Sequence, residues 1–349
     1  MHFKKVELED YKKIQPYFDN QPYLMCDYSF GALYMWRDLY QTEFAIENDV
    51  LYIKYVEPED KREDFAYPLF LGEHTKEQEK KAIRRMQEIT CRCKENCERL
   101  VLACVPDEAL KFLADNFKIK EMTVERMWAD YIYSYEEIFT LAGRKFSSKR
   151  NHKKNFERSY PNSELRPITK ENLDDVIAFY EELARKEAEA RAEQESSENL
   201  GSQESQKDKP DKIYIKQDEQ MTKMEEEETL ITLRNVLKLP GQGAALYVGD
   251  KIVGFTLGEK VADTLIIHVE KADVGYKGAY TKLFHEYVLM HEGQDIKYIN
   301  REEDLGDLGL RKSKMSYQPI KLVGKNAVVF EKCDMAANKK HDHKQIIRQ

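Results

Sequence analysis

The sequence lacks long apolar runs, and it contains few cysteines for its length. No run approaches the roughly 20 apolar residues that a membrane-spanning helix needs. The N-terminus, Met1-His-Phe-Lys-Lys, leads into an acidic segment without the apolar core of a secretory signal. The 6 cysteines among 349 residues form no convincing disulfide framework for a chain of this size. These absences argue against a membrane or secreted protein and predict a reducing, cytoplasmic location.

The cysteines do not predict a metal site either. Cys91, Cys93 and Cys97 lie close together, but their spacing fits no common zinc knuckle and no fourth ligand is nearby. His341 and His343 lie in a polar tail over residues 333–349, a composition that does not hold a defined site. We therefore expect no metal.

Charge is distributed unevenly along the chain. The formal net charge is −8, and residues 181–228 alone carry 16 acids and 8 bases. The rest of the chain is therefore formally neutral, so the total charge indicates no particular class of partner. Residues 187–220 are rich in Glu, Gln, Ser, Lys and Asp, which predicts a mobile insertion or a solvated helical extension.

Two segments far apart in the sequence share one pattern of apolar residues. Residues 3–18 and 165–180 each read as a short strand, a polar break and a helix with apolar positions at 3.6-residue spacing. A hairpin pattern follows each copy, turning at Asn48-Asp49 and at Gly249-Asp250. Two matches in the same order favour a duplication.

The duplication predicts an α+β protein of two similar domains with mixed central sheets flanked by helices. The N-terminal domain is expected over residues 1–143 and the C-terminal domain over residues 144–332. Residues 187–220 are then an acidic insertion in the second domain. The first domain is expected to act mainly as a support, because the polar motifs gather in the second.

The second domain places a glycine turn between two buried strands. Residues 264–269 and 296–299 are apolar runs typical of buried strands. Between them, Gly275 and Gly278 precede a helix whose N-terminal N–H groups could face an anion. Hairpin, strand, glycine turn, helix and strand follow one another as in the GNAT acyltransferase fold, where the acyl donor lies between two splayed neighbouring strands.

Charged groups of both signs follow the second of these strands. Residues 300–317 hold four acids, four bases and two glycines. Ligands of open α/β sheets bind at the carboxyl ends of the strands, so this block is expected to line a cleft.

Several short motifs resemble one known family. They are His268-Val-Glu-Lys271, Gly278-Ala-Tyr280, Asn300-Arg-Glu-Glu-Asp-Leu-Gly306, Gly309-Leu-Arg-Lys-Ser-Lys314 and Ser316-Tyr-Gln-Pro319, with Ser29-Phe30, Trp36, Tyr131-Ile-Tyr133 and residues 143–152 upstream. The chain resembles the soluble DUF2156 family, which is similar to the C-terminal domain of phosphatidylglycerol lysyltransferases. The resemblance implies two tandem GNAT-like domains, as in the Fem aminoacyltransferases.

The resemblance also implies a reaction. It is the transfer of an aminoacyl group from aminoacyl-tRNA to an amine or hydroxyl on a small molecule, a peptide or a lipid headgroup. The ester is already activated, so no cofactor is obligatory. The alternatives are an acetyl-CoA-dependent N-acetyltransferase and a non-catalytic GNAT-like module that binds an anionic ligand.

The candidate residues fall into three groups, each with a structural alternative. Those for proton handling or for oxyanion or phosphate stabilisation are Glu270, His268, Arg301, Arg311 and Lys314. Those for substrate binding are Lys271, Asn300, Glu302, Asp304, Tyr317, Gly275 and Gly278. Strand alternation predicts that His268 and Glu270 share a face. The alternative is a core histidine and a network of ion pairs.

The third group lies in a basic segment, residues 144–158, with seven bases against one acid. Such a segment suits a nucleic-acid backbone, and tRNA is the expected partner. The predicted contacts are Lys149, Arg150, His152 and Lys153. A solvated helix between the domains explains the same pattern.

Overall fold

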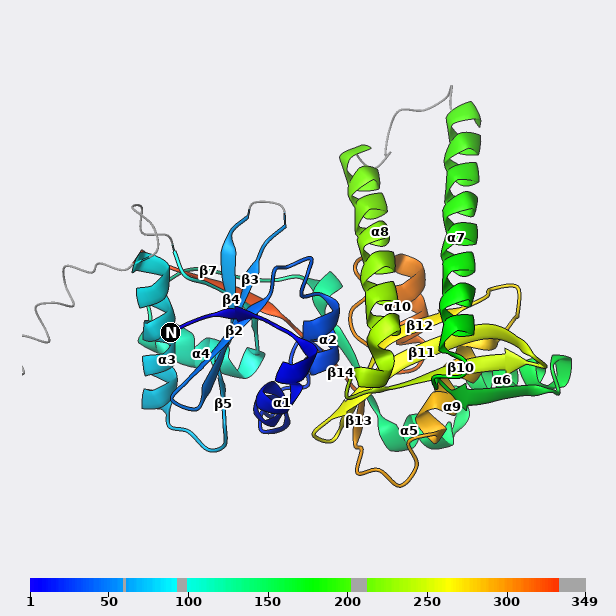
Figure 1. The fold of residues 1–349 in the computed structure, drawn as a ribbon, viewed down its shortest axis with the longest axis horizontal. Coiled ribbons are helices and arrows are strands. Elements are labelled where there is room, and N and C mark those ends of the chain that lie inside the picture. Colours follow the sequence, from blue (N-terminus) through cyan, green and yellow to red (C-terminus); the bar gives the residue numbers. More distant parts are fainter. Residues whose placement is uncertain (59–60, 93–98, 202–211, 333–349) are drawn as a thin grey trace, which may run out of the picture.

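The computed structural model describes residues 1–58, 61–92, 99–201 and 212–332. It is a mixed α+β molecule whose two sheets lie at opposite ends of the long axis, with helices packed around each (Figure 1). The tail 333–349 lies outside the described residues, as do Cys93 and Cys97. None of the helices in the described ranges has the length and apolar composition that a bilayer crossing requires.

The first sheet runs in the order β1-β2-β3-β4-β6-β15-β7, and β5 also pairs with β3. Its strands are β1 (Lys4–Lys5), β2 (Glu43–Glu47), β3 (Val50–Val56), β4 (Glu63–Ala66), β5 (Leu69–Phe70), β6 (Val101–Val105), β7 (Ile119–Val124) and β15 (Asn326–Phe330). Around it lie η1 (Leu8–Asp10), α1 (Tyr11–Asp19), α2 (Phe30–Met35), α3 (Lys76–Arg92), α4 (Asp107–Asn116) and η2 (Arg126–Trp128).

The second sheet runs in the order β14-β8-β13-β12-β11-β10-β9. Its strands are β8 (Asp130–Ser134), β9 (Ser163–Pro167), β10 (Gln242–Val248), β11 (Lys251–Val261), β12 (Thr264–Ala272), β13 (Tyr298–Asn300) and β14 (Lys321–Val323). The helices of this half are α5 (Tyr135–Thr140), η3 (Arg144–Phe146), α6 (Ser147–Ser159), α7 (Leu173–Gly201), α8 (Lys212–Asn235), η4 (Val236–Lys238), α9 (Ala279–Leu289) and α10 (Leu308–Met315).

The two halves repeat one arrangement, as the sequence predicts. In the first, β1, α1 and the β2–β3 hairpin follow one another, and in the second β9, α7, α8 and the β10–β11 hairpin do so. Both strand triplets are antiparallel. The predicted turns form with positive φ, at Asn48 (54°) and Asp49 (57°) in one hairpin and at Gly249 (61°) in the other. Short polar residues and glycine accept this left-handed backbone with little strain.

The two halves exchange strands, so the sheets do not divide the chain at residue 143 as expected. β8, from the first half, pairs with β13 and β14 in the second sheet. β15, from the end of the second half, lies between β6 and β7 in the first sheet. Both strands pair with a neighbour on each side. The order of segments along the sequence does not show which of the two sheets contains those neighbouring strands.

The acidic insertion is helical wherever it is described. α7 and α8 rise as a pair from one face of the second sheet, while α6 and α9 lie on the opposite face (Figure 1). Arg191 of α7 forms an ion pair with Glu226 of α8 at 3.1 Å. A helical extension is therefore the form of the insertion on both sides of residues 202–211, which lie outside the described residues.

A β-bulge in β12 changes the direction of its side chains. Leu257 of β11 pairs with Val269 and Gly258 pairs with Ile267, so His268 is an extra residue without a partner on β11. Ile267 packs in the cluster of the α9 side chains Phe284 and Tyr287, and Val269 packs in the cluster of Tyr180 of α7. The extra residue therefore reverses the alternation of faces between residues 267 and 269.

Candidate functional site

The parallel strands β12 and β13 are paired only at their beginnings. The paired positions are Thr264 with Tyr298, Leu265 with Ile299 and Ile266 with Asn300. β12 continues to Ala272, whereas β13 ends at Asn300, and the backbone of Arg301 and Glu302 then bonds to Tyr131 of β8. Beyond Asn300 the two strands are no longer paired with each other, and charged side chains from β12 and from residues 301 and 302 bridge this gap.

One bridge is an ion pair between Arg301 and Glu270. The Nε and Nη2 atoms of Arg301 lie 2.8 and 2.7 Å from Oε2 of Glu270. The guanidinium also lies over the rings of Phe284 at 4.0 Å and Tyr317 at 5.0 Å. The pair is incomplete, because Nη1 of Arg301 and Oε1 of Glu270 are buried and have no hydrogen-bond partner. A buried N–H donor and a buried oxygen acceptor that make no hydrogen bond each lower the stability of the folded protein, unless a ligand supplies the missing partners.

Lys149 of α6 lies beside this bridge. Its side chain is buried, and its Nζ atom is 3.7 Å from the ring centre of Tyr317. Burial, and secondarily the charge of Arg301, lowers the pKa of Lys149 to about 8. The segment predicted to contact nucleic acid thus places one of its lysines inside the candidate site.

The second bridge is formed by His268 between two carboxylates. Its Nδ1 atom lies 2.8 Å from Oε1 of Glu302, and its Nε2 atom lies 3.1 Å from Oε1 of Glu259. Burial alone lowers the pKa of His268, but the hydrogen bonds to Glu259 and Glu302 outweigh it and raise the pKa to about 10. At neutral pH the ring is an imidazolium with both nitrogens occupied, so it is not free to accept a proton.

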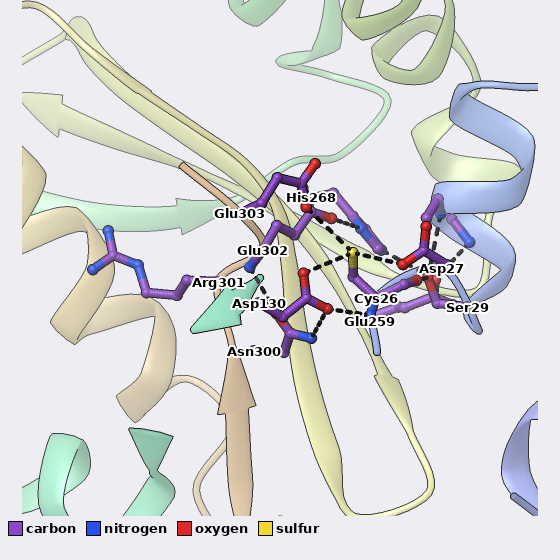
Figure 2. A network of polar contacts seen from close by, with 12 residues as sticks. Cys26, Asp27, Ser29, Asp130, Glu259, His268, Asn300, Arg301, Glu302 and Glu303 are labelled. Carbon is purple, nitrogen blue, oxygen red and sulfur yellow. Dashed lines mark hydrogen bonds and ion pairs between the residues drawn. The ribbon is translucent and has the colours of Figure 1, made fainter. Parts of the chain in front are cut away.

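His268 and Glu270 face opposite sides of the sheet, which corrects the expectation that they share a face. Arg301, the partner of Glu270, points away from the network around His268 (Figure 2). The β-bulge at His268 is the physical reason, because it inserts one residue into the alternation.

A buried lysine lies at the centre of the network on the His268 side. The Nζ atom of Lys325 lies 3.0 Å from Asp27, 3.1 Å from Asp130 and 2.8 Å from Glu303. It also lies 3.1 Å from the thiol of Cys26. Burial raises the pKa of Asp130 to about 7. The network joins the segment before α2, the start of β8 and the residues after β13 (Figure 2).

The same network contains a group of possible metal ligands. Within the described ranges, Cys26, Asp130 and Glu303 bring ligand atoms within 4.8 Å of one another. The ammonium of Lys325 contacts all three of these side chains. A metal ion would have to displace this ammonium, so the donor set does not fit a cation site.

Asp304 is the centre of a separate structural network. It is fully buried, and its carboxylate accepts hydrogen bonds from Arg311 at 2.8 and 2.9 Å and from the hydroxyl of Tyr131 at 2.6 Å. Arg126 lies 3.1 Å away, and the N–H of Gly306 donates at 2.9 Å. The substrate-binding candidate Asp304 and the catalytic candidate Arg311 are thus both engaged with protein groups.

Lys314 and Asn300 are also turned toward the protein. The ammonium of Lys314 donates to the carbonyl of Arg301 at 2.6 Å and to the carbonyl of Glu303. Asn300 is fully buried and donates to the carbonyl of Leu24 and to Asp130, both at 2.8 Å. Their contacts hold the chain after β13 in place rather than offering a charge to a ligand.

The glycine turn before α9 is partly closed. The N–H of Gly275 donates to the carboxylate of Asp273 at 2.8 Å. Gly278 has φ +95°, and a Cβ atom there would lie 3.0 Å from the carbonyl oxygen of His152. Lys271, before the turn, is bound to Glu225 of α8 at 3.0 Å. An anion at this turn would meet the charge of Asp273 on one side and α6 on the other.

The other predicted nucleic-acid contacts differ in exposure. Arg150 donates to the carbonyl of Gly143 at 2.7 Å, and Lys153 lies 2.8 Å from Glu286. His152 is exposed, and so are Lys154 and Arg158 of the same helix. Only the exposed side chains remain available to a nucleic-acid backbone.

Several residues of the candidate site come from the first half of the chain and were not predicted from the sequence. Cys26, Asp27 and Asp130 belong to the Lys325 network, and the N–H of Gly31 donates to Glu259 at 2.5 Å. A Cβ atom on Gly31 would lie 2.6 Å from both Glu259 and His268. The Ser29-Phe30 motif beside Gly31 was the available signal, but nothing in it indicates contact with β12.

A cavity of about 440 Å³ lies at the other end of the same strand pair. It is lined by residues of the segment before α2, of the β11–β12 turn and of β13. Its acidic side chain, Asp263, is bound to Lys297 at 3.0 Å. The reactive groups lie beyond the paired part of the strands, so we place the site there and not in this cavity.

Comparison with known proteins identifies a family. Residues 22–325 match the family described as "Phosphatidylglycerol lysyltransferase, C-terminal". A conserved protein of unknown function from Bacteroides thetaiotaomicron has a crystal structure with 31% sequence identity and a TM-score of 0.76. The alignment covers 94% of this chain and 99% of that one.

Two more distant structures share the fold. The C-terminal DUF2156 domain of a protein described as a lysylphosphatidylglycerol synthetase, from Agrobacterium fabrum, is 12% identical with a TM-score of 0.58, covering 92% of each chain. L-PGS from Bacillus licheniformis is 13% identical with a TM-score of 0.53, covering 85% of this chain and 86% of that one. They confirm the predicted α+β fold and its likeness to lysylphosphatidylglycerol synthetase C-terminal domains.

A curated relative covers less of the chain. An uncharacterized protein of Mycoplasmoides gallisepticum is 25% identical over 195 residues, which are 54% of this chain and 52% of that protein. The match thus spans about half the length of this relative.

Proposed function

Because the chain belongs to the phosphatidylglycerol lysyltransferase C-terminal family, we propose that it is an acyltransferase that moves an aminoacyl group from aminoacyl-tRNA to an amine or hydroxyl acceptor. The observation that carries the proposal is the gap between β12 and β13. There, an arginine and a glutamate each leave one buried polar atom open.

The open atoms suit the chemistry of an aminoacyl ester. Attack on the ester carbonyl creates an oxyanion, which a buried cationic donor stabilises strongly in a low-dielectric site. Nη1 of Arg301 is such a donor, and Oε1 of Glu270 is an acceptor for the ammonium of the aminoacyl group or for the attacking amine or hydroxyl. Their shared ion pair fixes both groups in place, which favours orientation of the reactants.

His268 has a supporting role in this proposal. Both of its ring nitrogens are engaged by carboxylates, so it holds β12 against α2 and the chain after β13. The proton of the acceptor passes to a group on the opposite face, where Glu270 and Lys149 lie.

An acetyl-CoA donor fits the turn before α9 less well. A pyrophosphate needs free N–H groups at this turn. The N–H of Gly275 is already bound by Asp273, whose negative charge would repel a phosphate. The donor is therefore the point on which the first experiment should discriminate.

The experiment supplies the protein with tRNA charged with a radiolabelled amino acid, and separately with labelled acetyl-CoA, together with small amines and a cell extract as acceptors. We expect label to leave the tRNA and to enter an acceptor. Glu270→Gln keeps the shape of the side chain but removes its charge, and we expect a loss of transfer of about 100-fold or more. Glu121→Gln, at an exposed position of β7 in the first sheet, is the matched control.

Three outcomes contradict the proposal. Label that moves only from acetyl-CoA would establish the rival donor. Unchanged transfer by Glu270→Gln would remove that carboxylate from the reaction, and no transfer from either donor by the folded protein would favour a binding module.

A further inference from the structure

Lys149 is a buried cation whose charge is not matched. Among the buried lysine and arginine side chains of the described ranges, it is the one whose charged group makes no hydrogen bond or ion pair. Each of the others has at least one partner: Arg37 has Asp38, Arg301 has Glu270, Lys282 has Glu157 and Glu286, and Lys314 has two backbone carbonyls. A buried charge without a partner is strongly unfavourable, so a reason for it is expected.

The position of Lys149 is fixed by its helix. Phe146 and Phe156 are both fully buried and anchor α6 on the second half of the molecule. Phe156 follows Lys149 by seven residues, which is close to two helical turns, so both lie on the inward face. Lys149 therefore lies on the face of α6 that packs against the protein, and its side chain is buried there.

A second cation beside it is also incompletely bound. Lys149 and Arg301 lie over the same ring, that of Tyr317, at 3.7 and 5.0 Å. Nη1 of Arg301 is buried without a partner. Glu270 pairs with Arg301, and within the described ranges no carboxylate pairs with Lys149.

We propose that Lys149 and Arg301 bind a monoanionic group of a substrate, a carboxylate or a phosphate, beside the ring of Tyr317. One anion accepts from the ammonium of Lys149 and from one of the two N–H groups on the open Nη1 of Arg301, which leaves the other N–H of Nη1 for the oxyanion. Lys and Arg donors to carboxylate and phosphate make charge-assisted hydrogen bonds, which are about twice as strong as neutral ones. The inference extends the proposed function to the same site, but binding is measurable without any transfer.

Binding is coupled to the protonation of Lys149. The pKa of this lysine is lowered to about 8 by burial and by Arg301, and a bound anion favours the charged form. An anion that raises the pKa by one unit reduces the reactive free amine about tenfold at neutral pH. The reactivity of Lys149 therefore reports on occupancy.

The first test is competitive labelling. The full-length protein is pulsed with an acetylating reagent at pH 7, and modification of each lysine is followed by peptide mass spectrometry. Inorganic phosphate and acetate are compared with chloride at constant ionic strength. We expect one of the anions to slow labelling of Lys149 about tenfold and to leave Lys154, exposed on the same helix, unchanged.

The two anions separate the possible sources. Protection by phosphate alone indicates a phosphate-bearing substrate, and protection by acetate alone indicates a carboxylate. If both anions leave the labelling of Lys149 equal to that in chloride, the subsite does not exist.

Lys149→Met is the second test, with Lys154→Met as its control. Methionine keeps the apolar stem and removes the buried charge, so in chloride we expect a thermal midpoint no lower than that of the parent. We also expect loss of the stabilisation that the effective anion gives the parent and the Lys154→Met variant. A destabilised Lys149→Met variant that keeps the full anion response would overturn the proposal in favour of a structural role.

The results distinguish this inference from the proposed function. If anions protect Lys149 but no transfer from aminoacyl-tRNA occurs, the anion subsite is supported and the proposed transfer reaction is contradicted. If transfer occurs but anions do not protect Lys149, the transfer reaction is supported and the anion subsite is contradicted.

Discussion

Replacing His268 with glutamine tests whether the imidazolium between Glu259 and Glu302 holds the two halves of the molecule together. The ring joins β12 to Glu259 of β11, which also binds the N–H of Gly31 in α2. Glutamine retains a side-chain amide donor but carries no charge. The substitution therefore leaves the two carboxylates without the cation between them.

The magnitude follows from the pKa of His268. It is raised from 6.5 to about 10, and each unit is worth about 1.4 kcal/mol of interaction with the charged form. Because the folded-state pKa lies above the unfolded one, the contribution is complete below pH 6.5 and is lost as the pH rises through 10. It amounts to roughly 4 kcal/mol at pH 7, falls to roughly 1 kcal/mol at pH 9 and is almost lost at pH 10.

The assay is urea unfolding followed by tryptophan fluorescence, with the parent and His268→Gln compared at pH 7, 8, 9 and 10. We expect the difference in unfolding free energy to fall by roughly 1.4 kcal/mol per pH unit above pH 7.5. His152→Gln on the exposed face of α6 controls for the loss of a histidine. A difference that stays constant across this range refutes the reasoning, because it would show that His268 acts through packing and not through its charge.

Two further predictions concern other charged groups. Asp304→Asn should cost about 3 kcal/mol of unfolding free energy at pH 7, because it removes the buried negative charge that Arg311 binds and replaces one acceptor oxygen with an NH2 group that faces other donors. Burial alone raises the pKa of Asp304, but hydrogen bonds led by Arg311 lower it well below its usual value. The stability that the Asp304 carboxylate contributes is therefore present above pH 3.8 and lost as the pH falls further. An acid unfolding curve of the variant identical to the parent's would contradict this. If tRNA binds the exposed face of α6, its affinity should fall steeply with salt, and replacing Lys154 and Arg158 with glutamine should reduce the slope of log K against log salt by about 2. An affinity independent of salt would rule out the phosphate contacts.

The sequence predicted correctly the turns and the helices and strands whose own residues determine their conformation. The hairpin turns at Asn48-Asp49 and Gly249-Asp250 require positive φ, and short polar residues and glycine supply it. The buried strand at residues 264–269 and the helix after Gly278 form because their apolar residues repeat with the period of the element. The order of strand, glycine turn, helix and strand then led to the correct fold.

The arrangement of the site could not be predicted in the same way. One extra residue in β12 separates His268 from Glu270, and a bulge of this kind leaves the apolar pattern almost unchanged. Lys149 was assigned to a charged surface because five other bases surround it between residues 145 and 158, but Phe146 and Phe156 set the face of the helix. The partners of Lys325 come from three distant segments, and only the folded chain brings them together.

The exchange of β8 and β15 has a consequence for synthesis on the ribosome. Within the described residues, β7 pairs only with β15, so its edge remains open until residue 330 has left the exit tunnel. β8 likewise has no paired neighbour until β13 and β14 have been synthesised. The two halves therefore cannot mature one after the other during translation, and the nascent chain reaches its last strands before either sheet is complete. Until these strands emerge, β7 and β8 expose unpaired edges, to which a strand of another chain can add.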